Sequence, residues 1–253
     1  MYAEERQRAI LEQARRNGRV DVATLAAAFE ITSETVRRDL TVLERGGVVR
    51  RVHGGAIPVE RLGIEPGLDA RDVVRAAEKD RIAAAALERI PARSAIPLNS
   101  GTTVARLANL VPADREPTVA TPSLPTACAL AHRPGVTLML IGGRLRGHTM
   151  ASVDSWAFNA LKDTYVDIAF FGTDGFSVER GLATPDAAEA MVKRAAIASA
   201  RRTVVPADHT KIGNDHFARF GDLGDVGTLI TDTGVDPQAA DEITRAGVKV
   251  ITV

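Results

Sequence analysis

The sequence predicts an α/β protein in two parts, a small winged helix-turn-helix domain followed by a larger domain built on a mainly parallel sheet. Two short amphipathic helical segments, separated by the turn Glu30–Thr32, precede a basic β-branched run. Further along, short apolar runs alternate with helical patterns up to the last residue. Such alternation indicates a parallel sheet covered by helices. We expect the first domain at 1–57, a linker at 58–72 and the second domain at 73–253.

Composition limits the possible functions. A chain of 253 residues, 45% of them hydrophobic and 4% aromatic, can bury a core made mostly of aliphatic side chains and alanine. Its net charge is zero, so any nucleic-acid binding must come from a local basic patch. The single cysteine, Cys128, excludes an intrachain disulfide and is typical of a reducing compartment. No apolar run approaches the roughly 18 residues of a membrane span, so we expect a cytoplasmic protein without membrane contact.

The first two helices are predicted from their apolar positions and end signals. Residues 4–17 are dense in charge and end at Asn17-Gly18, which favours a helix that supports the two that follow. Residues 22–29 form the second helix, with Asp21 as the expected N-cap. The short turn after it is the connection that a helix-turn-helix requires.

The third helix carries the most informative surface. Val36, Leu40 and Leu43 recur at helical spacing and line one stripe. We expect Ser33 to cap this helix and Gly46-Gly47 to end it. The stripe leaves the polar side chains of the first turns facing away from the core: Ser33, Glu34, Thr35, Arg37 and Arg38. The run VVRRVHGG then predicts a short hairpin, or wing.

The basic face of this helix predicts DNA binding. Between Val36 and Gly55 there are five arginines against Asp39 and Glu44, a local excess of positive charge. In a helix-turn-helix the N-terminal residues of the second helix enter the major groove, where arginine reaches guanine edges or phosphates. The alternative is a pair of amphipathic surface helices with solvated arginines. The cap, the short turn, the double glycine and the basic hairpin together favour DNA.

The second domain begins with a helical pattern over 69–90 and continues with apolar runs that predict strands at 95–98, 118–120, 136–141, 166–171, 203–205, 228–231 and 248–253. Helical patterns lie between most of them, at 103–110, 124–131 and 186–200, the last with Thr184 as its expected cap. Polar loops follow the strands. In an open parallel sheet these loops meet at the carboxyl edge, where ligands bind. The loops are Asn99–Thr103, Thr121–Ser123, Gly142–Arg144, Gly172–Gly175, Ala207–Lys211 and Asp232–Gly234.

An anion is the ligand that these loops favour. NSGTT leads directly into a helix, where backbone N–H groups and the helix dipole attract a phosphate, although the same residues also serve as plain capping. Lys211 is either a second phosphate contact or a surface lysine. Asp174 and Asp208 could bind sugar hydroxyls, act as acid or base, or cap. Gly142-Gly143 fits a tight turn that also admits a ligand to the backbone.

Several site classes are not predicted. The sequence has neither GxxxxGK[ST] nor GxGxxG, so we expect no nucleotide cofactor. No metal site is predicted from the spacing of His132, His148, His209 and His216. There is no Gly-x-Ser-x-Gly elbow, and we assign no catalytic residue.

With both parts read, the chain resembles the DeoR family of bacterial transcriptional regulators along its whole length. The resemblance rests on VDVATLAAAFEITSETVRRDLTVLERGGVVRRVHGGA in the first domain and on NSGTT, LIGGRL, DIAFFGTDGFS, GLATPDAAEAMVKRA, ADHTKIG and LITDTG in the second. It implies a winged helix-turn-helix that binds a double-stranded DNA operator, usually as a repressor of sugar-catabolism genes. It also implies a sensor domain related to ribose-5-phosphate isomerase, with a phosphorylated sugar as effector.

The resemblance also implies roles for particular residues. DNA would be contacted by Ser33, Thr35, Arg37, Arg38, Arg50, Arg51 and His53. The effector would be bound by Asn99, Ser100, Gly101, Thr102, Thr103, Thr121, Ser123, Gly142, Gly143, Asp174, Gly175 and Lys211. Three positions depart from the family pattern, which commonly has aspartate at Asn99, asparagine at Pro122 and glycine near Asp154.

Two other functions compete with a sugar-phosphate-responsive regulator. One is a sugar-phosphate isomerase or deaminase with a DNA-binding head, with Asp174 as its base. The other is an architectural DNA binder without a ligand, which leaves the convergent loops unexplained. We expect a homo-oligomer, either dimer or tetramer, since two linked heads bind DNA with higher avidity than one.

Overall fold

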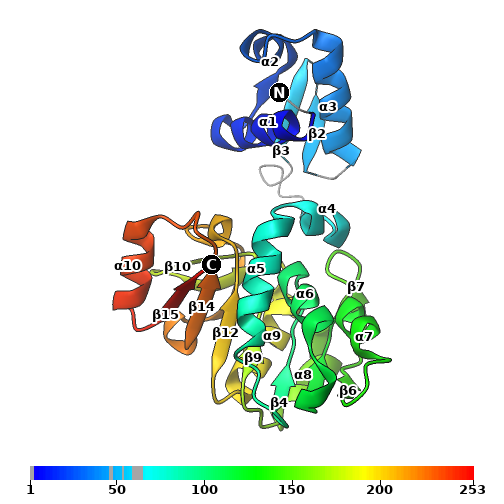
Figure 1. Cartoon of the computed structure of the whole chain (residues 1–253), viewed down its shortest axis with the longest axis vertical. Coiled ribbons are helices and arrows are strands. Elements are labelled where there is room, and N and C mark those ends of the chain that lie inside the picture. Colours follow the sequence, from blue (N-terminus) through cyan, green and yellow to red (C-terminus); the bar gives the residue numbers. More distant parts are fainter. Residues whose placement is uncertain (1–2, 46–47, 53, 59–64) are drawn as a thin grey trace. The chain divides into compact units, whose positions relative to one another are not determined.

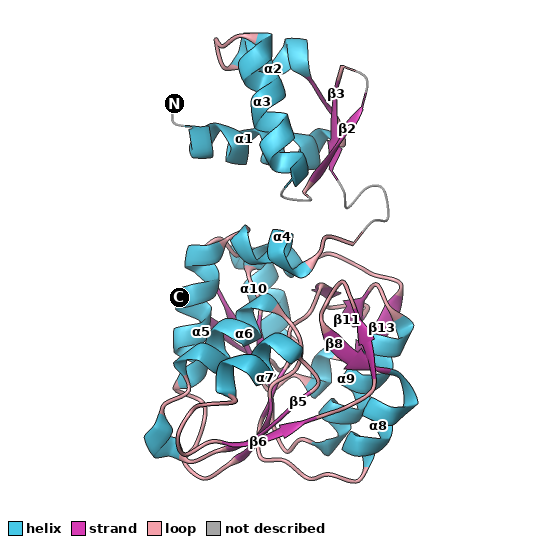
Figure 2. Ribbon diagram, turned by 90° about the vertical axis from the view of Figure 1, so that its right-hand side faces the viewer, coloured by secondary structure: helices cyan, strands magenta, loops and turns pink. Residues whose placement is uncertain are grey.

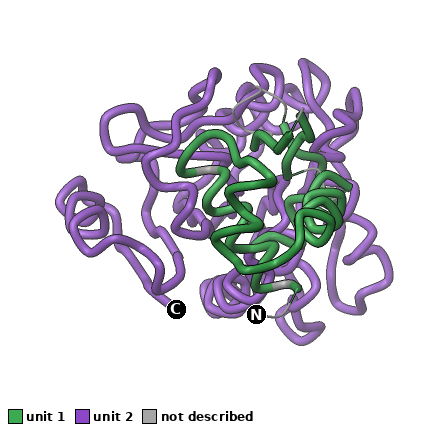
Figure 3. The backbone as a smooth tube through the Cα atoms, turned by 90° about the horizontal axis from the view of Figure 1, so that it is seen from above, with its two compact units in different colours: residues 1–74 green, residues 75–253 purple. Residues whose placement is uncertain are grey.

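The computed structural model describes residues 3–45, 48–52, 54–58 and 65–253. The chain divides into two compact units, residues 1–74 and residues 75–253, which Figure 3 draws in different colours. Each unit has its own buried core. Among the described residues, no helix is long and apolar enough to cross a membrane.

The N-terminal unit is a three-helix bundle closed by a small sheet. Its helices are α1 (Ala3–Asn17), α2 (Val22–Ala28) and α3 (Ser33–Arg45). The antiparallel sheet has the order β1-β3-β2, from β1 (Val20–Asp21), β2 (Val49–Val52) and β3 (Gly55–Pro58). Val36, Leu40 and Leu43 are buried in the core together with Ile10 and Leu25. The predicted helix-turn-helix and hairpin are therefore confirmed.

The helix ends of this unit differ from the predictions. Thr32, not Ser33, caps α3, because its hydroxyl accepts a hydrogen bond from the Thr35 N–H at 3.2 Å while Ser33 is already helical. Asp21 occupies the N-cap position of α2 but makes no capping hydrogen bond, since its carboxylate accepts from Arg19 instead. The expected stop at Gly46-Gly47 lies outside the described residues.

The helical pattern predicted over 69–90 is two helices, α4 (Leu68–Val73) and α5 (Ala76–Leu87). The break falls at Val74 and Arg75, where Arg75 adopts a left-handed conformation with φ +53°. That conformation is costly for a residue with a Cβ and cannot continue a right-handed helix. Periodicity persisted across the break because apolar residues lie on both sides of it.

The C-terminal unit is built on parallel strands that Figure 1 places at its centre. One sheet has the order β4-β5-β6, from β4 (Ala95–Pro97), β5 (Thr118–Thr121) and β6 (Thr137–Leu140). The other has the order β15-β14-β12-β9, from β9 (Ala169–Phe170), β12 (Thr203–Pro206), β14 (Thr228–Thr231) and β15 (Lys249–Thr252). A parallel bridge between Leu98 and Phe170 joins them, so the predicted strands form one continuous parallel arrangement.

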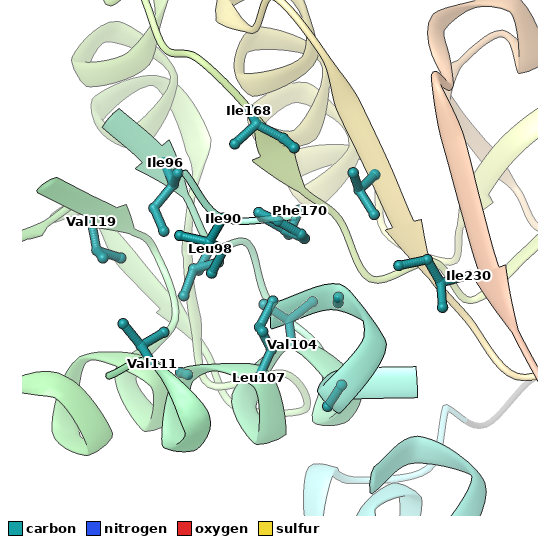
Figure 4. Packing of buried hydrophobic residues seen from close by; sticks show 14 of the residues in the cluster. Ile90, Ile96, Leu98, Val104, Leu107, Val111, Val119, Ile168, Phe170 and Ile230 are labelled. Carbon is teal, nitrogen blue, oxygen red and sulfur yellow. The ribbon is translucent and has the colours of Figure 1, made fainter. Parts of the chain in front are cut away.

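Helices cover both faces of this sheet. They are α6 (Thr102–Leu110), α7 (Leu124–Leu130), α8 (Asp154–Lys162), α9 (Ala187–Ser199) and α10 (Pro237–Arg245). Alternate residues of one strand enter different cores: Phe170 packs with α5, α6 and α7, whereas Ala169 packs with α8 and α9. Figure 4 shows Val104 and Leu107 of α6 close to Leu98 and Phe170. Burial on both faces explains why the inner strands β9, β12 and β14 are mostly apolar.

The antiparallel strands of the C-terminal unit were not predicted. They form a hairpin of β7 (Arg144–Arg146) and β8 (Ala151–Val153), and a sheet of β10 (Gly175–Ser177), β11 (Gly181–Thr184) and β13 (Ala218–Gly221). Figure 2 shows β11 and β13 beside α9. Their short, glycine-containing sequences carry little strand signal. Thr184 ends β11, so it is not the cap of α9; Asp186 is, accepting from the Glu189 N–H at 2.9 Å.

Candidate functional site

The first turns of α3 present two exposed arginines. The guanidinium of Arg37 lies 3.7 Å from the Glu34 carboxylate, and that of Arg38 lies 3.9 Å from it. These pairs are solvent-exposed and therefore weak, so both arginines can exchange Glu34 for another anion. Ser33 and Thr35 are partly exposed at the start of the same helix, and the Thr35 hydroxyl shares a hydrogen bond with that of Thr32 at 2.9 Å.

The hairpin of β2 and β3 adds two further arginines. Consecutive strand residues point to opposite faces, so Arg50 and Arg51 project from different sides of β2. Arg51 donates from its guanidinium to the Thr41 hydroxyl at 3.2 Å, and its backbone N–H donates to the Glu44 carboxylate at 2.9 Å. The wing is thereby joined to α3. His53 lies outside the described residues.

A buried carboxylate fixes α3 against α1. Asp39 is 3% exposed and accepts from Arg6 Nε at 2.6 Å, from Arg6 Nη2 at 3.2 Å and from Gln7 Nε2 at 3.0 Å. The hydrogen bond to Asp39 raises the pKa of Arg6, which stays charged. Because Asp39 and the two exposed arginines belong to one short helix, this contact sets how the arginines are presented.

In the C-terminal unit, the NSGTT loop lies at the carboxyl edge of the sheet, as predicted. Asn99 and Ser100 are each 2% exposed, and Gly101 has φ +136°. Gly101 precedes α6 without any side-chain cap, and Thr102 and Thr103, also buried, form its first turn. The N–H groups of that first turn are therefore available to an anion. Asn99 Oδ1 accepts from the Ser100 N–H at 2.7 Å, whereas its buried Nδ2 has no hydrogen-bond partner in the described structure.

A charged network from α9 lies against this loop. Ser100 donates from its hydroxyl to Glu189 Oε1 at 2.8 Å. The Lys193 ammonium lies 3.3 Å from the same oxygen, and Arg146 Nη1 lies 3.4 Å from Glu189 Oε2. Glu189 and Lys193 are 3% and 1% exposed. The sequence predicts no role for these three residues. The spacing of Glu189 and Lys193, four residues apart in an alanine-rich helix, is the sequence feature that could have indicated an ion pair.

Asp174 belongs to the same network. Its carboxylate accepts from the Thr184 hydroxyl at 2.8 Å and lies 4.0 Å from the Lys193 ammonium. Lys193 also donates to the Gly172 carbonyl at 3.0 Å, and a Cβ on Gly172 would overlap the Ser100 carbonyl. The loops after β4 and β9 are thus in direct contact, with Lys193 beneath both. The structure brings Asp174 to the NSGTT loop, as the carboxyl-edge argument predicted.

Other predicted effector residues have structural partners. The Thr121 hydroxyl donates to the Leu98 carbonyl at 2.6 Å, and the Ser123 hydroxyl caps α7 by accepting from the Thr126 N–H. Gly175 is a glycine because a Cβ would collide with Asn214. Gly142 and Gly143 are exposed, and a Cβ on Gly143 would approach the Val153 carbonyl to 2.9 Å.

The loop after β12 contains a histidine–carboxylate pair. His209 Nδ1 lies 2.7 Å from Asp232 Oδ1, at the end of the adjacent strand β14. Burial would raise the pKa of Asp232, but backbone hydrogen bonds from His209 and Gly234 outweigh it and lower that pKa. Asp208 caps the short helix His209–Lys211, and Lys211 is partly exposed on it. Capping is the role of Asp208 that this geometry supports.

Asp154 explains one departure from the family pattern. Its φ of +73° lies in the left-handed region that favours glycine. Its carboxylate accepts from Arg144 Nε at 2.6 Å, which raises the pKa of Arg144. An exposed ion pair thus accompanies a backbone conformation in which a glycine would be less strained.

The network can hold an anion beside polar groups that bind hydroxyls. The uncapped helix N-terminus favours negative charge and Asp174 can accept from hydroxyl groups, whereas Lys193 and Arg146 are already paired with carboxylates of the network. Over the ranges that the structure describes, no group of three or more His, Cys, Asp or Glu side chains is arranged to hold a metal ion.

Family comparisons match both units. Residues 6–61 match the DeoR-like helix-turn-helix domain, and residues 74–233 match the DeoR C-terminal sensor domain. Among solved structures, ribose 5-phosphate isomerase A from Methanocaldococcus jannaschii is similar at 17% identity, covering 53% of each chain with a TM-score of 0.38. This likeness is distant and assigns no activity.

Relatives align along nearly the full chain. The transcriptional regulator YulB of Bacillus subtilis is 31% identical over 100% of this chain and 98% of its own. The regulator GlpR of Haloferax volcanii is 34% identical, over 99% and 98%. The putative aga operon transcriptional repressor of Escherichia coli O157:H7 is 30% identical, over 98% and 93%. The chain belongs to the DeoR family of helix-turn-helix transcriptional regulators.

Proposed function

We propose that this regulator represses sugar-catabolism genes and that a phosphorylated sugar, bound at the NSGTT loop, lowers its affinity for the operator. One observation carries the ligand assignment. The buried, uncapped start of α6 follows Asn99, whose amide nitrogen has no hydrogen-bond partner in the described structure, and the buried Lys193 and partly buried Arg146 pair with the Glu189 that binds Ser100. Relatives named as repressors of an aga operon and as the repressor GlcR support the regulatory part.

Each part of the site has a proposed role. The N–H groups of Thr102 and Thr103 hold the phosphate, with Ser100 as a further donor. Asn99 Nδ2 donates to a ligand oxygen, because it is a buried donor that lacks a partner. Asp174 accepts from a sugar hydroxyl.

On the DNA side, we propose that α3 lies in the major groove. Arg37 and Arg38 meet base edges or phosphates there, and Ser33 and Thr35 contact the backbone at the start of the helix. Arg50 and Arg51 of the wing contact flanking phosphates. The exposure of these arginines and the hydrogen bond from Arg51 to Thr41 support a surface that α3 and Arg51 share, with Arg50 on the other side of β2.

The full-length protein allows a direct test of the ligand. Sugar phosphates are screened by thermal shift, hits are tested for turnover, and DNA affinity is measured with and without each hit on a sequence selected from a random pool. We expect a hit that raises the melting temperature, forms no product and weakens DNA binding by about 1–3 kcal/mol, a typical coupling energy. Product formation would favour the isomerase alternative. A hit that leaves DNA affinity unchanged would contradict regulation by that ligand.

Asn99→Asp tests the charge preference of the site. Asn99 replaces the aspartate that is common in the family, and a carboxylate there would oppose a phosphate held one residue away. We expect the ligand to bind more weakly to this variant by about 1 kcal/mol or more. Asn109→Asp, at an exposed position near the end of α6, is the matched control. Equal or tighter binding by Asn99→Asp would show that Asn99 does not select for negative charge.

We also propose that the protein is a homo-oligomer. β6 is the last strand of its sheet, and its Met139 and Leu140 are 56% and 55% exposed. An open edge with apolar side chains is a surface that a second chain can cover. Light scattering should give a multiple of 26.9 kDa. A mass of one chain at micromolar concentration would contradict this proposal.

A further inference from the structure

The phosphate loop already binds an anion that belongs to the protein. The Ser100 hydroxyl donates to Glu189 Oε1 at 2.8 Å, although Glu189 lies 89 residues further along the chain. Glu189 is 3% exposed, so its carboxylate is held inside the site and is not a surface group. An internal carboxylate therefore lies where the loop would meet a ligand.

The Glu189 carboxylate also forms ion pairs with Lys193 and Arg146. Glu189 Oε1 lies 3.3 Å from the Lys193 ammonium, and Glu189 Oε2 lies 3.4 Å from Arg146 Nη1. A hydroxyl, an ammonium and a guanidinium are the donors that proteins direct at phosphate oxygens. All three converge here on one glutamate. Its two oxygens fill positions that two phosphate oxygens could take.

We propose that Glu189 determines ligand specificity by acting as an internal competitor for the anion position. This inference rests on the proposed phosphate-binding function of the NSGTT loop. In the unliganded protein, Glu189 satisfies Ser100, Lys193 and Arg146. A ligand binds only when its anion displaces the Glu189 carboxylate from Ser100.

Charge decides which ligands succeed. A phosphomonoester carries between about one and a half and two negative charges at neutral pH and has three acceptor oxygens, so it outcompetes a carboxylate. A ligand with a single carboxylate has the same charge and oxygen count as Glu189 and gains nothing by replacing it. The site therefore selects phosphate esters over sugar acids.

Inorganic phosphate is the probe that tests this inference. Its affinity for the full-length protein is measured by calorimetry at fixed ionic strength for wild type, Glu189→Gln and Glu189→Asp. Glu189→Gln removes the charge and should bind phosphate about tenfold more tightly, because a like charge a few ångströms away is lost. Glu189→Asp keeps the charge but is one methylene shorter, so it withdraws from Ser100 and should also bind phosphate more tightly than wild type.

Two further variants separate displacement from general charge effects. Asp186→Asn removes a carboxylate that pairs with Arg146 at 3.1 Å, and asparagine is equally suited to cap α9. Asp186 has no contact with Ser100 among the interactions described, so this control should tighten phosphate binding less than Glu189→Gln. Adding Ser100→Ala to Glu189→Gln should remove most of the gain. Circular dichroism tests whether each variant is folded. If Glu189→Gln does not fold, the phosphate affinity of Glu189→Asp is compared with that of wild type instead.

The outcomes distinguish the two proposals. Phosphate binding of equal strength in wild type and both Glu189 variants overturns the internal competitor and leaves the phosphate loop intact. An equal gain in Asp186→Asn and Glu189→Gln also overturns it, since the effect is then charge alone. No phosphate binding in any folded variant overturns the phosphate loop, and the competitor with it.

Discussion

Removing the Asp39 carboxylate should loosen the DNA-binding unit selectively. Asp39 is 3% exposed and accepts three hydrogen bonds from α1, two from Arg6 and one from Gln7. In Asp39→Ala these donors lose the hydrogen bonds that they make to Asp39, and the Arg6 guanidinium keeps its charge on a side chain that is only 12% exposed. Breaking a buried pair of this kind costs about 3–5 kcal/mol. Because part of Arg6 still reaches water, we expect the lower end, about 3 kcal/mol.

Hydrogen exchange of the full-length protein measures this loss in place. A loss of about 3 kcal/mol corresponds to about 150-fold faster exchange of amides that exchange by opening of the unit. The increase should appear in peptides from α1 and α3. Peptides from the C-terminal unit, which has a separate core, should be unchanged.

Two matched variants complete the experiment. Glu34→Ala removes a carboxylate from the same helix, but one that is 64% exposed. The free energy of opening derived from exchange should therefore change by less than about 1 kcal/mol. The double variant Arg6→Met/Asp39→Leu removes both charges and should be more stable than Asp39→Ala, because the single variant removes only one member of a buried pair. If Asp39→Ala exchanges no faster than Glu34→Ala, the contact does not hold α3 and our reasoning is refuted.

Four other predictions concern DNA binding, backbone strain and pH. Arg37→Ala should weaken binding to the selected DNA sequence by about 1–3 kcal/mol, whereas Arg51→Ala should weaken binding to all sequences and reduce the salt slope, as gel shifts at two salt concentrations will show. Glu34→Gln should strengthen binding to random DNA, because it releases two arginines from their shared carboxylate; unchanged affinity would contradict this. Asp154→Gly should leave the melting temperature nearly unchanged, since relief of a left-handed aspartate, about 1 kcal/mol, offsets the lost exposed ion pair. Asp232→Asn should destabilise the protein at neutral pH and less in acid. Folding lowers the pKa of the Asp232 carboxyl, so this group stabilises the fold at pH values above its ordinary pKa, and the stabilisation disappears as the pH falls through the lowered pKa. Denaturant titrations at several pH values will measure this.

The parts of the fold that the sequence predicts are those where one pattern dominates. The spacing of Val36, Leu40 and Leu43 fits only a helix with one buried face. The parallel strands are apolar on both faces, so each appears as a continuous run. The hairpin β7–β8 lacks such a pattern, because two of the three residues of β7 are arginines, Arg144 and Arg146, which form ion pairs with aspartates.

The sequence predicts the loops of the candidate site but not the buried charged residues of α9 that lie against them. Asn99 and Ser100 follow a strand, and their position at the sheet edge follows from topology alone. Glu189 lies in the first turn of a helix and Lys193 in its middle, where charged residues are normally assigned to solvent. Only the fold shows that this face of α9 is turned inward against the NSGTT loop. Thr121 and Ser123 were predicted as effector ligands, and their hydroxyls also form hydrogen bonds with the backbone that the sequence did not indicate.

The burial of Glu189 and Lys193 has a consequence for how the family can evolve. Removing either charge alone leaves the other buried with fewer partners, so a single substitution at one of the two positions lowers stability. We therefore expect the two positions to covary among relatives, changing together or with Arg146. Homologues that have lost the pair should also have lost the hydroxyl at the position of Ser100, and they would form a separate lineage with a different inducer.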